Sequence, residues 1–176
     1  MAQNGDKILF YSTIGEYGCF SNFSRHQFEI NGVVWRTSEH YFQAMKTDDP
    51  VKQEAIRLAP TPAAAAKMGR DRRLGLRADW DAIRDDVMMT ALRAKFTAHD
   101  AIKRILVSTG TREIVEHTAK DRYWADGGDG TGQNRLGMLL MQLRAEFVAE
   151  AQRVNAQVIA AQVIADAQVD ADANNA

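Results

Sequence analysis

The residue types best suited to chemistry are concentrated in one glycine-rich segment, residues 121–137, which reads DRYWADGGDGTGQNRLG. Glycine lets a backbone adopt positive φ angles and approach a ligand closely. A structural turn rarely needs carboxylates, an indole, an amide and a guanidinium together. The segment therefore predicts a site for a flat, polar, anionic small molecule.

A second set of polar residues lies in the segment 37–46. On a helix, Glu39, Gln43 and Lys46 follow one another at i, i+4 and i+7 and form a narrow stripe. The remaining circumference is largely apolar, so we expect this stripe to line a cleft. The alternative is a capping box, in which Glu39 serves the helix dipole and Lys46 is a solvated cation. The spacing leaves both interpretations open.

Two tryptophans and an arginine cluster are further candidates. Trp80 begins a predicted helix, where a core anchor is the favoured interpretation and stacking on a heterocycle is the alternative. Trp124 lies in the glycine-rich loop and has no helical face to bury, so a binding role is favoured there. Four arginines between residues 70 and 77 either form a solvated turn or supply one or two phosphate contacts.

The sequence predicts neither a metal nor a cofactor. The four histidines lack metal-ligand spacing, and the single cysteine, Cys19, has no partner. Residues 127–132 match neither a Walker loop nor a dinucleotide fingerprint. His40, beside Glu39, is a weak candidate acid or base, with packing as its alternative.

Length and composition indicate one globular domain in a chain of 176 residues. The lone cysteine, the absence of a secretory signal and the lack of any long apolar run predict a cytoplasmic protein with no membrane partner. The net charge of −1 argues against a generic nucleic-acid-binding surface. The oligomeric state is left open.

The elements that must position these residues are mainly helical, with a small N-terminal β element. We expect a strand at 7–11, a loop at 12–22, a hairpin over 27–35 that turns at Asn31-Gly32, and a strand or turn at 113–118. Thr61 is expected to cap a helix that ends at Gly69, and Asp79 to cap the best-defined helix. The expected helices span 37–46, 51–58, 63–68, 80–96, 101–107 and 136–150.

Residues 1–150 form the predicted domain, and residues 151–176 a low-complexity tail rich in Ala, Gln and Val. The sequence AQVIA repeats there with a period of five, which does not match a helix. We expect a frayed helix or a disordered segment without chemistry.

Several blocks of the sequence resemble the YbiA-like proteins of the NADAR superfamily, which is named for its association with NAD and ADP-ribose chemistry. The resemblance extends from about Ile8 to Phe147. The blocks are CFSNF at 19–23, WRTSEHYFQAMK at 35–46, AKMGRDR at 66–72, LRAKF at 92–96, VEHT at 115–118, YWADGG at 123–128 and GQNRLG at 132–137.

This resemblance implies an N-glycosidase with a mainly helical fold. YbiA-like members hydrolyse early riboflavin-pathway intermediates, the ribosylaminopyrimidine phosphates, and other members remove ADP-ribose from guanine in DNA or RNA. The expected partner is thus a small-molecule ribosyl phosphate or ADP-ribose-type ligand, with ADP-ribosylated nucleic acid as the alternative. A non-catalytic reader of ADP-ribose or nucleotides ranks lower, because Glu39, Lys46 and Asp121 are all present.

The resemblance also suggests roles, since the family's acid falls on Glu39, its lysine on Lys46, its tryptophan on Trp80 and its aspartate on Asp121. Cleavage of a ribose–nitrogen bond builds positive charge on C1′, which we expect Glu39 to stabilise, with Asp121 or Asp126 as second carboxylate. A general acid must also protonate the leaving nitrogen.

Lys46 has two possible roles: an ammonium that holds Glu39 ionised or binds phosphate, or a neutral amine that attacks the open-chain sugar. Trp80 and Trp124 would sandwich or flank the base, and Asn134 and Arg135 would hold ribose hydroxyls or phosphate. Arg70 and Lys95 are secondary candidates for the phosphate. The expected substrate-binding residues are Ser21, Asn22, Phe23, Gln43, Arg70, Trp80, Lys95, Tyr123, Trp124, Asn134 and Arg135.

Overall fold

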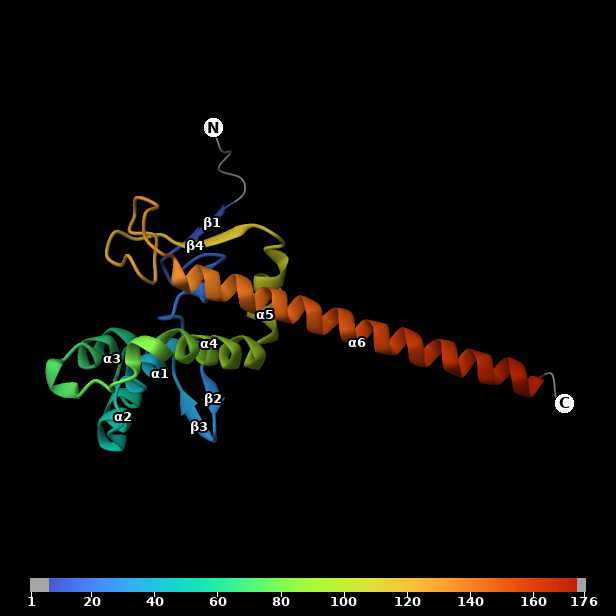
Figure 1. Cartoon of the computed structure of the whole chain (residues 1–176), viewed down its shortest axis with the longest axis horizontal. Coiled ribbons are helices and arrows are strands. Elements are labelled where there is room, and N and C mark those ends of the chain that lie inside the picture. The colour runs from blue at the N-terminus through green and yellow to red at the C-terminus, as the bar shows by residue number, and fades with distance from the viewer. Residues whose placement is uncertain (1–6, 174–176) are drawn as a thin grey trace. The chain divides into compact units, whose positions relative to one another are not determined.

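Helices dominate the part of the chain that the computed structural model describes, residues 7–173, with side chains described up to residue 162 (Figure 1). The mainly helical class predicted from the sequence is confirmed. The contacts divide the chain into two compact units, one ending at Leu143 and the other beginning at Arg144. Everything that positions the candidate site belongs to the first unit.

Two strands far apart in the sequence form a parallel pair. β1 (Lys7–Phe10) runs beside β4 (Glu113–Glu116), with Leu9 opposite Val115. Parallel strands require a long crossover, and the helical segments between β1 and β4 supply it. Residues 113–116 are thus a strand rather than a turn, and the β structure is not confined to the N-terminal part of the chain.

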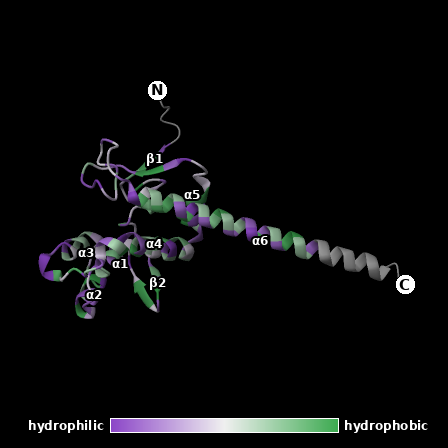
Figure 2. Cartoon of the chain, in the orientation of Figure 1, coloured by the Kyte–Doolittle hydropathy of each residue, from purple (hydrophilic) through white to green (hydrophobic). Residues whose placement is uncertain are grey.

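The predicted hairpin is present as β2 (Phe28–Ile30) and β3 (Val33–Trp35), which pair antiparallel. Asn31 and Gly32 have φ angles of 52° and 78°, which a two-residue turn of this kind requires at both positions. Figure 2 shows β3 in the colour of hydrophobic residues. Trp35 is buried, and its indole meets the ring of Tyr41 edge-on at 5.1 Å between centroids.

Three short helices begin at polar caps, of which the one at Thr61 is predicted from the sequence. The Thr37 hydroxyl accepts a hydrogen bond from the His40 backbone N–H at the start of α1 (Ser38–Ala44). Thr61 does the same for Ala64 in α3 (Pro62–Gly69), and the Asp49 carboxylate caps α2 (Pro50–Arg57). Polar side chains at these positions satisfy backbone N–H groups that have no partner inside the helix. α1 packs against α2, α3 and α4 and is the central element around the site.

Gly69 does not end α3 in the way that the sequence suggests. It is the last helical residue, and the following Arg70 keeps a right-handed conformation with φ −97°. A Cβ at position 69 would instead overlap the side chain of Gln43 on α1. The glycine is therefore needed for close contact between the two helices rather than for a left-handed turn.

The longest helix of the first unit, α4 (Trp80–Ala98), also differs from expectation at its start. The side chain of Asp79 makes no capping hydrogen bond. Its Oδ1 accepts a hydrogen bond of 2.6 Å from Arg77 Nε instead. A strong charge-assisted partner next to the helix has displaced the cap. α5 (Asp100–Ser108) follows directly, and two short 3-10 helices, η1 (Gly18–Phe20) and η2 (Arg72–Leu74), lie in segments expected to be loops.

α6 (Arg135–Ala173) begins in the first unit, where Leu136, Leu140 and Leu143 are buried. In the second unit the helix continues to Ala173 through the segment expected as a low-complexity tail, and residues 151–162 are exposed. The remaining tail residues, 174–176, lie outside the described range. Among the residues described, no helix combines the length and hydropathy required to cross a bilayer.

Candidate active site

A cavity of about 500 Å³ lies in the first unit, with walls contributed by α1, the turn after η1, the ends of β1, α3 and β4, and the loop after β4. A volume of this size suits a nucleotide-like ligand. Nine of the residues predicted from the sequence line it: Ser21, Asn22, Phe23, Glu39, Gln43, Lys46, Arg70, Asp121 and Trp124. The other lining residues are Tyr11, Thr13, Phe42, Ala66, Met88, Glu116, Thr118 and Lys120.

The polar stripe of α1 lies along the cavity wall. Glu39 is only 8% exposed, and its Oε1 accepts a hydrogen bond of 2.8 Å from Gln43 Nε2. The Glu39 backbone N–H donates to Asn22 O, which joins the start of the helix to the turn after η1. Burial raises the pKa of Glu39, and the bond from Gln43 and the charges of Lys46 and Arg70 oppose that rise. The stripe thus contains a buried carboxylate, Glu39, and one of the two cations, Lys46, whose charges oppose the rise in its pKa.

Lys46 lies at the end of this stripe and is only partly exposed. Its Nζ is 3.5 Å from Gly69 O and 5.4 Å from the centre of the Phe42 ring. Burial lowers the pKa of Lys46, Glu39 opposes this shift and Arg70 adds to it. A lysine in these surroundings is suited to either of its two expected roles, anion binding as an ammonium or nucleophilic attack as an amine.

The two tryptophans have different positions. Trp124 lines the cavity, and its ring meets that of Phe42 at 5.2 Å and 86°. Trp80 is 6% exposed and does not line the cavity. Its ring packs behind Phe42 at 5.0 Å, and Lys46 Nζ lies 5.8 Å from it. Trp80 therefore supports the wall, and only Trp124 can offer an indole face to a ligand.

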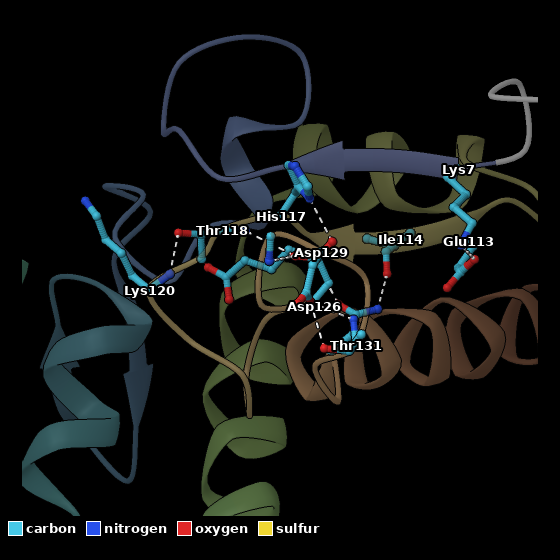
Figure 3. A network of polar contacts seen from close by, with 12 residues as sticks. Lys7, Glu113, Ile114, His117, Thr118, Lys120, Asp126, Asp129 and Thr131 are labelled. Atoms are coloured by element: carbon cyan, nitrogen blue, oxygen red, sulfur yellow. Dashed lines mark hydrogen bonds and ion pairs between the residues drawn. The ribbon is translucent and has the colours of Figure 1, made fainter.

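The two carboxylates of the glycine-rich loop also separate. Asp121 lines the cavity, and its Oδ1 accepts hydrogen bonds from the backbone N–H groups of Tyr123 and Trp124 at 2.8 and 2.7 Å. Asp126 lies away from the cavity among hydrogen-bond donors of its own loop (Figure 3). Of the two alternatives for a second carboxylate, only Asp121 has access to a bound ligand.

Asp126 holds the loop together instead. Its Oδ2 is 2.7 Å from His117 Nδ1, and its Oδ1 accepts from the backbone N–H groups of Thr118 and Gly128. Burial alone would raise the pKa of Asp126, but these hydrogen bonds and the His117 charge hold it below its ordinary value. A carboxylate this well satisfied is a structural anchor.

Tyr123 and Arg135 lie outside the cavity and hold the loop against α4. The Tyr123 hydroxyl donates to Asp85 Oδ1 at 2.7 Å, and Arg135 Nε donates to Asp85 Oδ2 at 2.8 Å. The Arg84 guanidinium lies over the Tyr123 ring, 3.7 Å from its centre. The polar groups of Tyr123 and Arg135 are thus hydrogen-bonded to Asp85 and do not line the cavity, so the structure does not place them for the substrate contacts that the sequence predicts.

Asn134 is also outside the cavity. Its Nδ2 donates to Ile114 O at 2.9 Å and its Oδ1 accepts from the Glu116 N–H at 3.0 Å. It adopts a positive φ of 48°, a conformation that asparagine tolerates better than most residues. The side chain connects the start of α6 to β4 and so fixes one wall of the cavity from behind.

Lys95 was expected to bind phosphate, but its side chain is completely buried in α4. Its Nζ donates to Cys19 O at 2.5 Å and to Ser21 O at 3.1 Å. Burial lowers the pKa of Lys95 to about 7. The lysine anchors the turn that presents Ser21, Asn22 and Phe23 to the cavity.

We expect replacement of Lys95 by methionine to change how stability depends on pH. Between pH 7 and its ordinary pKa of 10.5, Lys95 is neutral in the folded protein and charged in the unfolded chain. The unfolded chain then binds more protons, so rising pH stabilises the folded wild type through this group. The difference in unfolding free energy between wild type and Lys95→Met should therefore increase from pH 7 to pH 10 in urea titrations.

The exposed Lys67→Met variant is the matched control and should differ from wild type by the same amount at every pH. A constant difference for Lys95→Met as well would contradict the assignment of a depressed pKa to this lysine.

Glu116 is the main residue that the sequence did not single out. It ends β4, lines the cavity and has a pKa raised to about 7 by burial, with the charges of Asp121, Glu39 and Asp126 adding to the shift. The VEHT block at 115–118 contains it, but its orientation depends on the pairing of β4 with β1. No three His, Cys, Asp or Glu side chains within the described range are grouped as a metal site.

The geometry can be compared with known proteins. A model of the NADAR domain matches residues 9–148. The chain belongs to the NADAR domain family. The N-glycosidase YbiA of Escherichia coli K12 is 49% identical over 143 residues, which cover 81% of this chain and 89% of that protein.

Two further similarities extend this assignment. The NMR structure of the E. coli protein YbiA matches with a TM-score of 0.79 and 46% identity, covering 86% of this NADAR chain and 90% of that one. A riboflavin biosynthesis protein of Vibrio vulnificus is 39% identical over 140 residues, which cover 80% of this chain and 38% of that protein. The NADAR protein described here is accordingly an N-glycosidase that acts on a small molecule of ribosyl type.

Proposed function

We propose that this NADAR protein hydrolyses the ribose–nitrogen bond of a ribosylaminopyrimidine phosphate, an early intermediate of riboflavin synthesis. The charge layout of the cavity carries the proposal: Glu39 and Asp121 share one space of about 500 Å³ with Lys46 and Arg70. The similarity to a riboflavin biosynthesis protein supports this substrate class.

The carboxylates have the chemistry that the reacting sugar needs. Loss of the base leaves positive charge on C1′ and the ring oxygen, and an ionised Glu39 beside C1′ stabilises it. Asp121 adds negative charge at the same centre. Its Oδ1 is held by two backbone N–H groups, so the carboxylate is fixed before the substrate arrives.

The cations have the chemistry that the phosphate needs. Arg70 is exposed at the cavity wall, where its guanidinium can form two parallel bonds to phosphate oxygens. Lys46 lines the same cavity, where its ammonium can bind a phosphate, and its charge opposes the rise that burial gives the pKa of Glu39. Asn22 lines the same cavity, and its buried Oδ1 has no hydrogen-bond partner within the described residues, so it is suited to accept a bond from a ribose hydroxyl.

Replacement of Trp124 by alanine is expected to raise KM by about 10-fold to 100-fold with little change in kcat, because a stacked base gains about 1–3 kcal/mol from an aromatic face. Trp80→Phe is the matched control, because Trp80 lies behind the wall, and it should leave KM nearly unchanged. Steady-state kinetics with the pyrimidine substrate measure both. Equal KM values for Trp124→Ala and wild type would remove the indole from the binding site.

The proposed function is tested by incubating the full-length protein with a ribosylaminopyrimidine 5-phosphate and following free base and ribose 5-phosphate by chromatography. A Glu39→Gln sample is the control for contaminating activity. Release of base by wild type and not by the variant is expected. A wild type that leaves this substrate intact would overturn the proposal.

A second candidate is removal of ADP-ribose from guanine in DNA or RNA, and the lowered pKa of Lys46 favours it, because a neutral amine can form an imine with an opened sugar. Reduction with borohydride in the presence of ADP-ribose, followed by mass spectrometry, would trap such an adduct. Release of guanine from ADP-ribosylated oligonucleotides, in preference to base release from the pyrimidine substrate, would support this candidate over the first.

A further inference from the structure

Glu116 is held rigidly at the cavity by contacts on both sides of its backbone. Its N–H donates to Asn134 Oδ1 at 3.0 Å, and its C=O accepts from the Asp126 N–H at 3.0 Å. The residue pairs with Phe10 in the register of β1 and β4. Such a backbone fixes the direction of the Cα–Cβ bond, and the side chain of Glu116 lines the same cavity as Glu39 and Asp121.

Burial raises the pKa of both Glu116 and Glu39, but the polar groups around the two carboxyls differ. Glu39 accepts a hydrogen bond from Gln43 and interacts with the cations Lys46 and Arg70. The Glu116 carboxylate has no hydrogen-bond or ion-pair partner among the residues that the structure describes. The charges that raise its pKa are those of Asp121, Glu39 and Asp126.

When two nearby carboxylates share one proton, it resides on the group with fewer donors and cations around it. Burial and three acidic neighbours raise the pKa of Glu116 to about 7, so it retains a proton near neutral pH. The titratable and charged groups that line the cavity with it are Tyr11, Glu39, Lys46, Arg70, Lys120 and Asp121.

We propose that Glu116 is a catalytic residue, the general acid that protonates the leaving nitrogen, while Glu39 acts as the general base for water. This assignment rests on the N-glycosidase function proposed above. The Glu116 O–H proton moves to the glycosidic nitrogen, and the C1′–N bond breaks with its electron pair passing to that nitrogen. The oxygen of a water molecule bonds to C1′, and the proton that the water loses goes to Glu39. One water is consumed, and proton exchange with solvent restores both carboxylates.

The decisive experiment compares two substrates that share the ribosyl 5-phosphate and differ in whether the leaving group needs a proton. One is the ribosylaminopyrimidine 5-phosphate, and the other is 4-nitrophenyl riboside 5-phosphate, whose nitrophenolate leaves without protonation. Glu116→Gln should lower kcat on the first substrate by about 100-fold to 1,000-fold. On the second substrate it should lower kcat by about threefold or less, whereas Glu39→Gln should remain impaired on both.

The pH profile gives an independent readout on the wild-type enzyme. With the pyrimidine substrate, kcat/KM should fall above an apparent pKa near 7, as Glu116 loses its proton, and this alkaline limb should be absent in Glu116→Gln. Glu113→Gln, an exposed acid on the same strand that pairs with Lys7, is the matched control and should keep the wild-type profile. Glu116→Ala, which also removes the carboxyl group, provides a second variant if the glutamine variant is not folded.

The outcomes separate the two proposals. A wild type that is active on the pyrimidine substrate, with Glu116→Gln or Glu116→Ala folded and equally active, or with the alkaline limb retained in either one, would overturn the role of Glu116 alone. Equal losses on both substrates would show that Glu116 does not act on the leaving group, and would overturn it as well. A wild type inactive on the pyrimidine substrate would overturn the proposed function itself, whatever its activity on the nitrophenyl riboside.

Discussion

Glu39→Gln is expected to lower kcat by about 1,000-fold while KM changes little. The substitution preserves the shape of the side chain but removes the negative charge that stabilises the positive charge developing on C1′. A preorganised charge of this kind typically makes a large contribution to catalysis. Glu39 is buried, so water screens its charge poorly and its loss is felt strongly. Single-turnover rates with the pyrimidine substrate measure the chemical step directly.

Glu54→Gln is the matched control for this variant, because Glu54 is exposed on α2 and pairs only with Arg57 within the described residues. It should keep wild-type rates. A Glu39→Gln enzyme that retains more than about one tenth of the wild-type kcat would remove Glu39 from the chemistry.

Lys46→Ala is expected to lower kcat/KM for the phosphorylated substrate by about 100-fold and to affect the dephosphorylated substrate much less. A charge-assisted bond to phosphate contributes about 1.5–3 kcal/mol, which corresponds to a loss of that order. The comparison of two substrates isolates the phosphate contact from any general damage to the site. The exposed Lys67→Ala, on α3, is the control and should match wild type on both.

The same experiment separates the two roles of Lys46. If the amine attacks the sugar, Lys46→Ala should lose kcat on both substrates equally, and borohydride should trap an adduct on wild type alone. Unchanged kinetics on both substrates would exclude both roles.

Local rules of the sequence predict much of the fold. Thr37, Asp49 and Thr61 start helices because a polar side chain next to an apolar periodic segment satisfies free N–H groups, and this depends on few distant contacts. The turn at Asn31-Gly32 is also predicted locally, because both residue types tolerate the positive φ angles that this turn requires. The stripe of Glu39, Gln43 and Lys46 is fixed by helical geometry, and the structure places all three at the cavity.

Other positions depend on tertiary contacts that the sequence does not express. Trp80 and Trp124 are the same residue type, and the ring of Phe42 contacts both. Their packing leaves only Trp124 at the cavity, where it can contact a ligand. The sequence predicts a phosphate contact for Lys95, but in the structure its Nζ donates to the backbone carbonyls of Cys19 and Ser21.

The position of Glu116 at the cavity depends on the pairing of β1 with β4, and the sequence assigns no role to this residue. Glu116 has the same local signature as any charged residue at a strand end. Only its distant partner strand decides that it lines the cavity. Glu116 lies in the VEHT block that resembles the family, but the resemblance implies no role for it. Only its surroundings in the structure indicate a role.

The β1–β4 pair also has a consequence for how the protein is made. β1 is synthesised early, whereas the strand beside it is translated only after helices α1 to α5. Until then the edge of β1 remains open and the wall that bears Glu116 is missing, so the nascent chain on the ribosome has no complete pocket. Pairings between such distant segments slow folding and leave an exposed strand that can bind other chains. We therefore expect the edge of β1 to be open to pairing with other chains during translation, until residues 113–116 emerge.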